Sequence, residues 1–148
     1  MANYKKNQQT VPEVIVLGLF RGLWWLVTLP FRKKGKVKRG ISNEEKNYIR
    51  TKRNEILDLA NSDNKIELKH AVLEADKLVD FILKLKGCEG ETFADRLRAA
   101  EKFMDRNTYE SVWYAHKIRN QIAHDNGEIG RQTLVSATQK FLAYIQEI

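Results

Sequence analysis

Beyond residue 40, apolar side chains recur at spacings of three and four residues, and this periodicity limits the possible folds more than any other feature. Between residues 64 and 85 the recurring positions are Leu68, Val72, Ala75, Val79 and Ile82. Such spacing places them on one face of an α-helix. No stretch shows the alternation that is typical of a half-buried strand. Five helices are therefore expected, over about residues 42–61, 64–86, 92–104, 108–125 and 132–148.

Start and stop signals agree with these helices. Ser42 is followed three residues later by Glu45, and Thr92 by Asp95. In this arrangement the two side chains satisfy each other's backbone N–H groups at the start of a helix. Gly127, in an Asn-Gly pair, is typical of a helix end. Short connections favour antiparallel neighbours, so the sequence predicts an all-α fold, an antiparallel bundle of four to five helices.

Positive charge is concentrated before this helical region. The chain carries a net charge of +7, yet residues 1–40 contain nine Lys or Arg and one acidic residue, Glu13. Residues 41–148 contain 17 Lys or Arg and 18 acidic residues. A nearly neutral body has little long-range attraction for nucleic-acid phosphates. We therefore expect two parts, a basic N-terminal segment of residues 1–40 and a helical domain of residues 41–148, and no binding of duplex DNA by the domain.

An apolar stretch, VPEVIVLGLFRGLWWLVTLPF in residues 11–31, precedes the basic run RKKGKVKRG of residues 32–40. From Val14 to Phe31 there are 18 residues with one charge, Arg21. As a helix this stretch is about 27 Å long, close to the thickness of the hydrocarbon layer of a bilayer. Spanning the membrane is one possibility. A helix that lies in the membrane interface is a second, and packing against protein is a third.

Aromatic and basic side chains in this segment favour attachment to a membrane. Tryptophan prefers the headgroup boundary, and a basic run beside an apolar helix adds roughly 1 kcal/mol per charge on an anionic surface. Two such signals together give stable peripheral binding. The heavier basic flank keeps the domain on the cytoplasmic side. Residues 11–39 are thus expected to bind an anionic membrane surface, as an amphipathic or membrane helix, through Phe20, Arg21, Trp24, Trp25, Arg32, Lys33 and Lys34.

The helix expected over residues 108–125 has two unlike faces. Val112, Ala115, Ile118 and Ile122 share an apolar face, which we assign to the core. The other face carries Tyr109, Trp113, His116, Asn120 and His124. A surface of this kind usually meets another subunit, a ligand or more of the bundle. We expect a homodimer with this helix near its axis, and we assign to binding or to the interface the side chains of Tyr109, Trp113 and His116.

The segment RNQIAH, residues 119–124, resembles the Arg-Asn-x-x-x-His signature of the HEPN superfamily of small helical bundles. LKHAVLEADKLVDFILKLKG, ETFADRL and WYAHKIRNQIAHD resemble the long second helix, the following short helix and the motif helix of such domains. The resemblance covers about residues 43–148. In active members it implies a metal-independent ribonuclease that works as a dimer. Arg119 and His124 would then be the catalytic pair, with Asn120 as the polar residue that supports them.

The residue types of this motif suit that chemistry. RNA cleavage by its own 2′-hydroxyl needs proton transfer, for which an imidazole is suited. A guanidinium offers a planar fork to phosphate oxygens and stabilises the charge that develops on them. No metal-binding pattern surrounds the three histidines, and the chain has no Gly-rich phosphate loop. We therefore predict neither a metal nor a cofactor.

A purely structural role is the alternative for the same motif. Arg119 can tie two helices together through a carboxylate on the helix of residues 64–86. The candidate carboxylates are Glu74, Asp76 and Asp80. Asn120 and His124 can close the end of their own helix. Many members of the superfamily are inactive modules. The sequence thus leaves two functions, a membrane-associated binding or dimerisation module and, alternatively, a membrane-tethered ribonuclease acting on RNA.

Overall fold

The computed structural model describes residues 40–124 and 127–146. Within these residues every regular element is a helix and none is a strand. The elements are α2 (Asn43–Ala60), α3 (Lys65–Leu85), α4 (Phe93–Ala100), the 3₁₀ helix η2 (Glu101–Phe103), α5 (Arg106–Ala123) and α6 (Arg131–Gln146). The prediction of an all-α fold is confirmed for this part of the chain.

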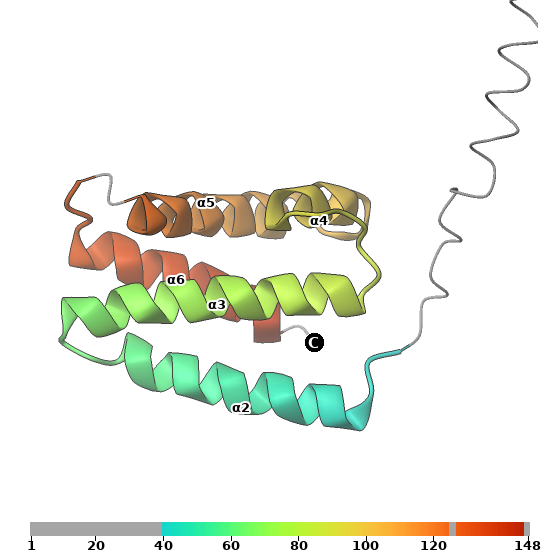
Figure 1. Cartoon of the computed structure of the whole chain (residues 1–148), viewed down its shortest axis with the longest axis horizontal. Helices are drawn as coiled ribbons and strands as arrows, with labels where there is room; N and C mark the ends of the chain where they lie inside the picture. The colour runs from blue at the N-terminus through green and yellow to red at the C-terminus, as the bar shows by residue number, and fades with distance from the viewer. Residues whose placement is uncertain (1–39, 125–126, 147–148) are drawn as a thin grey trace, which may run out of the picture. The chain divides into compact units, whose positions relative to one another are not determined.

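Four of the helices form an antiparallel bundle. In Figure 1, α2, α3, α5 and α6 lie along a common direction, and each runs opposite to the one that precedes it among these four. α3 contacts α2, α5 and α6, and α5 also contacts α6. The short α4 packs against α3. The predicted helical bundle is therefore confirmed, with α3 at its centre.

The core follows the apolar face of α3. Its periodic positions, Leu68, Val72, Ala75, Val79 and Ile82, are all fully buried, as their spacing predicts. Truncating a buried leucine to alanine typically costs about 2–5 kcal/mol. A row of such residues fixes both the place of α3 and its rotation about its axis. The polar groups that α3 carries beside this row are consequently held in defined positions.

Local capping explains where the helices begin. Ser42 Oγ accepts a hydrogen bond from the Glu45 N–H at 3.2 Å, and the Glu45 carboxylate accepts one from the Ser42 N–H at 2.7 Å. Thr92 and Asp95 form the same reciprocal pair at the start of α4. A cap of this kind is typically worth about 1 kcal/mol. Both predicted capping boxes are confirmed.

The boundary between the third and fourth predicted helices differs from the structure. The helix predicted over residues 92–104 ends as an α-helix at Ala100, and the 3₁₀ turn η2 follows it. α5 then begins slightly earlier than predicted, at Arg106. The reason is the Asp105 carboxylate, which accepts a hydrogen bond from the Thr108 N–H at 3.0 Å. A carboxylate there satisfies an open N–H group and lies at the positive end of the helix.

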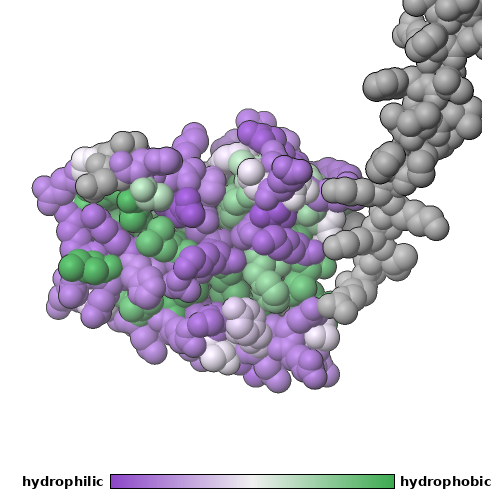
Figure 2. All heavy atoms as spheres, in the orientation of Figure 1, coloured by the Kyte–Doolittle hydropathy of each residue, from purple (hydrophilic) through white to green (hydrophobic). Residues whose placement is uncertain are grey.

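The face of the bundle that Figure 2 shows is mainly hydrophilic. Figure 2 shows polar side chains over most of one face, with hydrophobic ones gathered over its middle. Among residues 40–124 and 127–146, every helix is too short or too polar to span a bilayer. The predicted membrane-binding helix lies outside the described residues. This applies to all of its predicted anchoring side chains, Phe20, Arg21, Trp24, Trp25, Arg32, Lys33 and Lys34.

Candidate functional site

The RNQIAH segment forms the end of α5. Arg119 and Asn120 lie within the helix, and His124 follows its last residue as the C-cap. His116 lies one turn before Asn120, and side chains at positions i and i+4 share one side of a helix. α5 packs against α3, so this side of the helix comes close to the polar groups on α3.

A buried hydrogen bond joins α5 to α3 at His116. Its Nδ1 lies 2.7 Å from Asp76 Oδ1, and both side chains are buried. The imidazole stacks on Phe93 of α4 with 4.1 Å between the ring centroids, and Trp113 packs edge-on at 6.0 Å. Aromatic walls keep water away, and electrostatic interactions are stronger where water is excluded. The imidazole is thus fixed by its faces as well as by its polar edge.

Asn120 and Arg119 extend this contact into a network. The Asn120 amide Nδ2 donates to His116 Nε2 at 3.2 Å, and Arg119 Nη1 donates to Asn120 Oδ1 at 3.1 Å. Arg119 Nε lies 3.4 Å from Asp76 Oδ2. The donors and acceptors match when Nε2 of His116 accepts and Nδ1 carries the proton that is donated to Asp76. Four polar side chains from α3 and α5 therefore satisfy one another within a single subunit.

His124 lies apart from this network. Its side chain is exposed, and its backbone N–H donates to the Asn120 carbonyl at 3.0 Å, which closes the end of α5. Within the described part of one subunit, no hydrogen bond or ion pair joins its imidazole to Arg119. The structure thus brings Arg119 and Asn120 together with Asp76, and leaves His124 facing solvent.

A second polar tie lies one turn further along α3. Arg96 is buried on α4, where its Nε donates to Asp80 Oδ1 and its Nη1 to the Gly90 carbonyl, both at 2.6 Å. Lys84 Nζ lies 2.7 Å from the other oxygen of Asp80. Burial raises the pKa of Asp80, but hydrogen bonds from Arg96 and Lys84 outweigh it, so the pKa lies below its ordinary value. This tie holds α4 on α3.

One of the three carboxylates predicted as partners for Arg119 is observed in that position. It is Asp76, which the Arg119 guanidinium contacts as described above. Asp80 is occupied by Arg96 and Lys84. Glu74 lies 2.7 Å from Lys77 Nζ on its own helix. The predicted contact between helices through a buried carboxylate is therefore confirmed. The packing of α5 against α3 determines which of the three carboxylates Arg119 contacts.

The aromatic and imidazole face of α5 is only partly turned outward. His116, one of the residues that we assigned to binding or to the interface, is 8% exposed. Phe93 of α4 and Asp76 of α3 cover it, so this residue meets more of the bundle. Tyr109 and Trp113 are half-buried and pack against the core. Their assignment to a subunit interface stays a prediction.

The pairing of Asp76 with His116 could not be predicted from the sequence. The two residues are 40 positions apart, and no local pattern links a carboxylate on one helix to an imidazole on another. A signal was nevertheless present. Asp76 lies four residues after Val72 and three before Val79, inside the apolar stripe of its helix. A carboxylate on such a stripe needs a partner when it is buried.

Comparison with known proteins assigns neither a family nor a function to the chain. The chain matches no protein-family model, and no curated protein or solved structure matches it either. In residues 40–124 and 127–146, no group of three or more His, Cys, Asp or Glu side chains is arranged to hold a metal ion. The geometry itself is a polar network that holds α5 on α3, with one exposed imidazole beyond it.

Proposed function

We propose that this chain is a HEPN-like binding and dimerisation module, which its N-terminal segment holds at the cytoplasmic side of a membrane. The observation that carries the proposal is the network in which Arg119 and Asn120 bind Asp76 and His116 within one subunit. A guanidinium that is already paired with a buried carboxylate is poorly placed to stabilise charge on a phosphate. The motif then serves to fix α5 on α3, and binding is left to the surface of the domain.

Aromatic groups along α5 support dimerisation. Tyr114 is 40% exposed, and the half-buried Tyr109 and Trp113 lie on the same helix. Aromatic side chains are enriched at the cores of subunit interfaces. In a two-fold dimer the same surface of both subunits meets. A second copy that packs its α5 against this one would cover the exposed ring of Tyr114 in both subunits.

Sedimentation equilibrium of the full-length protein in mild detergent tests this interface. We expect a dimer, and we expect Tyr114→Asp to weaken it at least tenfold because it places a charge in the contact. Tyr48→Asp is the matched control, since Tyr48 is a similarly exposed tyrosine on α2, at 48%. A monomer at all concentrations would contradict the proposal, and so would equal effects of the two substitutions.

Flotation with vesicles tests the membrane attachment. The full-length chain is expected to float with vesicles of phosphatidylcholine and phosphatidylserine. Deletion of residues 1–39 removes the apolar and basic signals together and is expected to leave the domain in the soluble fraction. If the truncated chain still floats, residues 11–39 are not the anchor.

A second candidate function is a metal-independent ribonuclease, and the exposure of two motif side chains, Arg119 and His124, favours it. The His124 imidazole faces solvent, and the Arg119 side chain is 35% exposed. A second subunit can therefore approach both groups. The test is incubation of the full-length protein with single-stranded RNA in EDTA, beside Arg119→Ala and His124→Ala. His70→Ala is the matched control, because His70 is an exposed histidine on α3.

The two candidate functions predict different outcomes of that assay. Cleavage that is lost in both motif variants and kept in His70→Ala supports the ribonuclease. A folded dimer that leaves RNA intact at high protein concentration supports the module. Cleavage that survives His124→Ala would come from a contaminant or from another site, and would count against the ribonuclease.

A further inference from the structure

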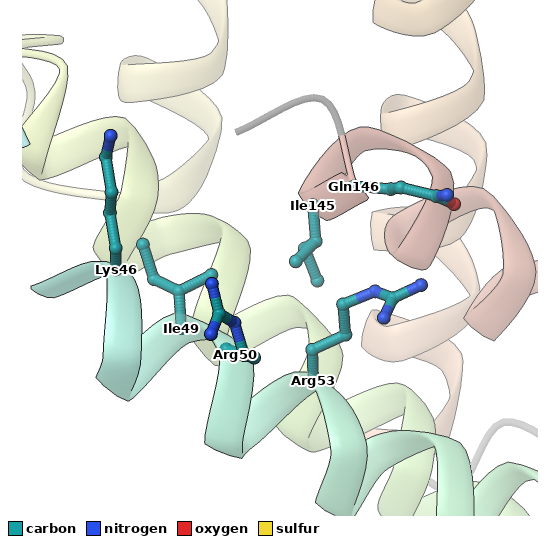
Figure 3. Close-up of a pocket in the computed structure, with 6 residues that line it drawn as sticks. All are labelled: Lys46, Ile49, Arg50, Arg53, Ile145 and Gln146. Atoms are coloured by element: carbon teal, nitrogen blue, oxygen red, sulfur yellow. The ribbon is translucent and has the colours of Figure 1, made fainter. Parts of the chain in front are cut away.

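Three basic side chains line a pocket between α2 and α6. The pocket has a volume of about 230 Å³, and its lining residues are Lys46, Ile49, Arg50, Arg53, Ile145 and Gln146. Figure 3 shows the basic side chains along α2, with Ile145 and Gln146 of α6 across from them. Ile49 and Ile145 are buried and form the apolar part of the lining. The pocket is therefore basic on one helix and partly apolar beneath.

The spacing of the basic side chains places all three along the pocket (Figure 3). Lys46, Arg50 and Arg53 are separated by four and three residues, which places them on one face of α2. Within the described residues, none of the three forms an ion pair or side-chain hydrogen bond, and no acidic side chain lines the pocket. By contrast, Lys52, on another face of α2, lies 2.6 Å from Glu55. A group of three positive charges without an ion-pair partner in residues 40–124 and 127–146 thus lies on an otherwise nearly neutral domain.

Arg53 adds an independent observation. Its Nε is buried and has no hydrogen-bond partner in the part of the chain that the structure describes. A buried donor without a partner carries a desolvation penalty that an acceptor would remove. Figure 3 shows the Arg53 side chain reaching from α2 toward Gln146, beside Ile145. The side chain that carries this unpaired donor therefore lines the pocket.

We propose that this pocket binds the phosphate group of a phosphomonoester. Such a group carries a charge of about −1.5 to −2 at neutral pH and three acceptor oxygens. Guanidinium groups offer planar forks that match these oxygens, and an ammonium adds a compact charge. Arg50 and Arg53 supply the forks, and Lys46 supplies the ammonium. A carboxylate or phosphodiester carries one charge and would leave more of the positive charge unmatched.

Two sources can present this chemistry, a lipid headgroup and a soluble phosphate compound. Lys46 follows the basic run of residues 32–40 closely in sequence, so a headgroup at the membrane surface is within the range of the domain. Only this lipid source rests on the proposed membrane function. Binding of soluble phosphate depends on the pocket alone, so failure of the anchor and failure of the pocket are distinguishable.

Titration of the isotope-labelled full-length protein with inorganic phosphate tests the pocket by NMR. Saturable shifts are expected at the amides of residues 46–53 and 145–146 and at the Arg53 Nε–H group. Arg50→Gln/Arg53→Gln should weaken this binding at least tenfold. Arg106→Gln/Lys117→Gln on α5 removes the same charge from two exposed residues and should change it less than twofold. If the double variant on α2 does not fold, Arg50→Gln alone, at an exposed position, should still weaken binding several-fold.

Vesicles separate the two sources. Phosphatidic acid presents a phosphomonoester, and phosphatidylserine at matched surface charge presents a phosphodiester and a carboxylate. For a lipid source, the full-length chain should prefer phosphatidic acid, and Arg50→Gln/Arg53→Gln should abolish that preference without abolishing flotation. For a soluble source, phosphate shifts the pocket residues and no preference among vesicles is found.

Three results would overturn the proposal. One is phosphate-induced shifts confined to the basic run of residues 32–39. Another is equal weakening by the α2 and α5 charge variants, which would mean that only overall charge matters. The third is displacement of phosphate by short single-stranded RNA at lower concentration than by a soluble phosphomonoester, which would make the pocket a nucleic-acid contact.

Discussion

Two carboxylates on α3, one helical turn apart, each bind an arginine from a later helix, and only one of these arginines belongs to the RNQIAH segment. Asp80 Oδ1 lies 2.6 Å from Arg96 Nε, and Asp76 Oδ2 lies 3.4 Å from Arg119 Nε. The Arg96 side chain is 9% exposed and the Arg119 side chain 35%. The motif arginine thus performs the same kind of structural task as an arginine outside the motif, through a looser contact.

Besides its arginine, each of the two carboxylates has a second partner, and these second partners differ in chemical type. Asp80 is shared by two cations, Arg96 and Lys84. Asp76 instead has the buried imidazole of His116 at 2.7 Å, closer than Arg119. The shorter contact of Asp76 is therefore the one with His116, and Arg119 adds a longer one. The motif is thus anchored through its neighbour His116 as much as through its own arginine.

The largest loss of stability is expected from removing the Asp76 carboxylate, which binds His116 and Arg119. Asp76→Ala leaves His116 Nδ1–H buried without its acceptor and Arg119 without its counter-charge. We expect a loss of about 3 kcal/mol in the free energy of unfolding. Asp76→Asn keeps the shape and an acceptor oxygen and should cost less. Urea unfolding followed by helical circular dichroism measures both, and a loss below about 1 kcal/mol for Asp76→Ala would refute the network.

The second-largest loss of stability is expected from removing the contact between Arg96 and Asp80, which lies outside the motif. Arg96→Ala removes two short hydrogen bonds, to Asp80 and to the Gly90 carbonyl, and is expected to cost about 2 kcal/mol. Arg98→Ala, on the same helix, removes an exposed ion pair with Asp95 and should cost below about 1 kcal/mol. The same unfolding experiment compares them. Equal losses would show that burial does not distinguish these arginines.

Acid should weaken the Asp80 tie. The pKa of Asp80 is lowered, so the folded state holds its proton less tightly than the unfolded state does. Its contribution is then fully present above the ordinary value near pH ~4 and is lost as the pH falls through the lowered pKa. Asp80→Asn should therefore lose less stability than the parent protein between pH ~5 and ~3. Unfolding curves across that range check this, and parallel losses in both proteins would contradict it.

The smallest effect is expected at the exposed end of the motif. His124→Ala removes an exposed side chain with no hydrogen bond to other described residues, and its backbone N–H still closes α5. The free energy of unfolding should change by less than about 0.5 kcal/mol. A calorimetric scan beside the parent protein measures this. A loss as large as that of Asp76→Ala would mean that both ends of the motif are anchored.

Helices could be predicted from the sequence because their signals are local. The capping boxes at Ser42 and Thr92 lie within four residues each, and the buried row on α3 has helical spacing. The partner of Arg119 could only be narrowed to three carboxylates, since the choice depends on how α3 and α5 rotate against each other. The burial of His116 depends in addition on Phe93, which α4 brings over it.

The basic pocket could be predicted from the sequence only in part. The spacing of Lys46, Arg50 and Arg53 is visible in the sequence and alone predicts one basic face of a helix. That face borders a pocket because α6 places Ile145 and Gln146 opposite it. Packing between helices that are far apart in the sequence therefore determines which groups lie opposite a basic helix face.

A double-mutant cycle on unfolding free energies tests the central claim most directly. The first cycle combines Asp76→Ala with Arg119→Ala, and the second combines Asp76→Ala with His124→Ala. We predict a coupling energy of at least about 0.5 kcal/mol in the first cycle and additivity in the second. Additivity in the first cycle, or equal coupling in both, would contradict the claim that the Arg119 end of the motif is a structural tie while His124 stands apart.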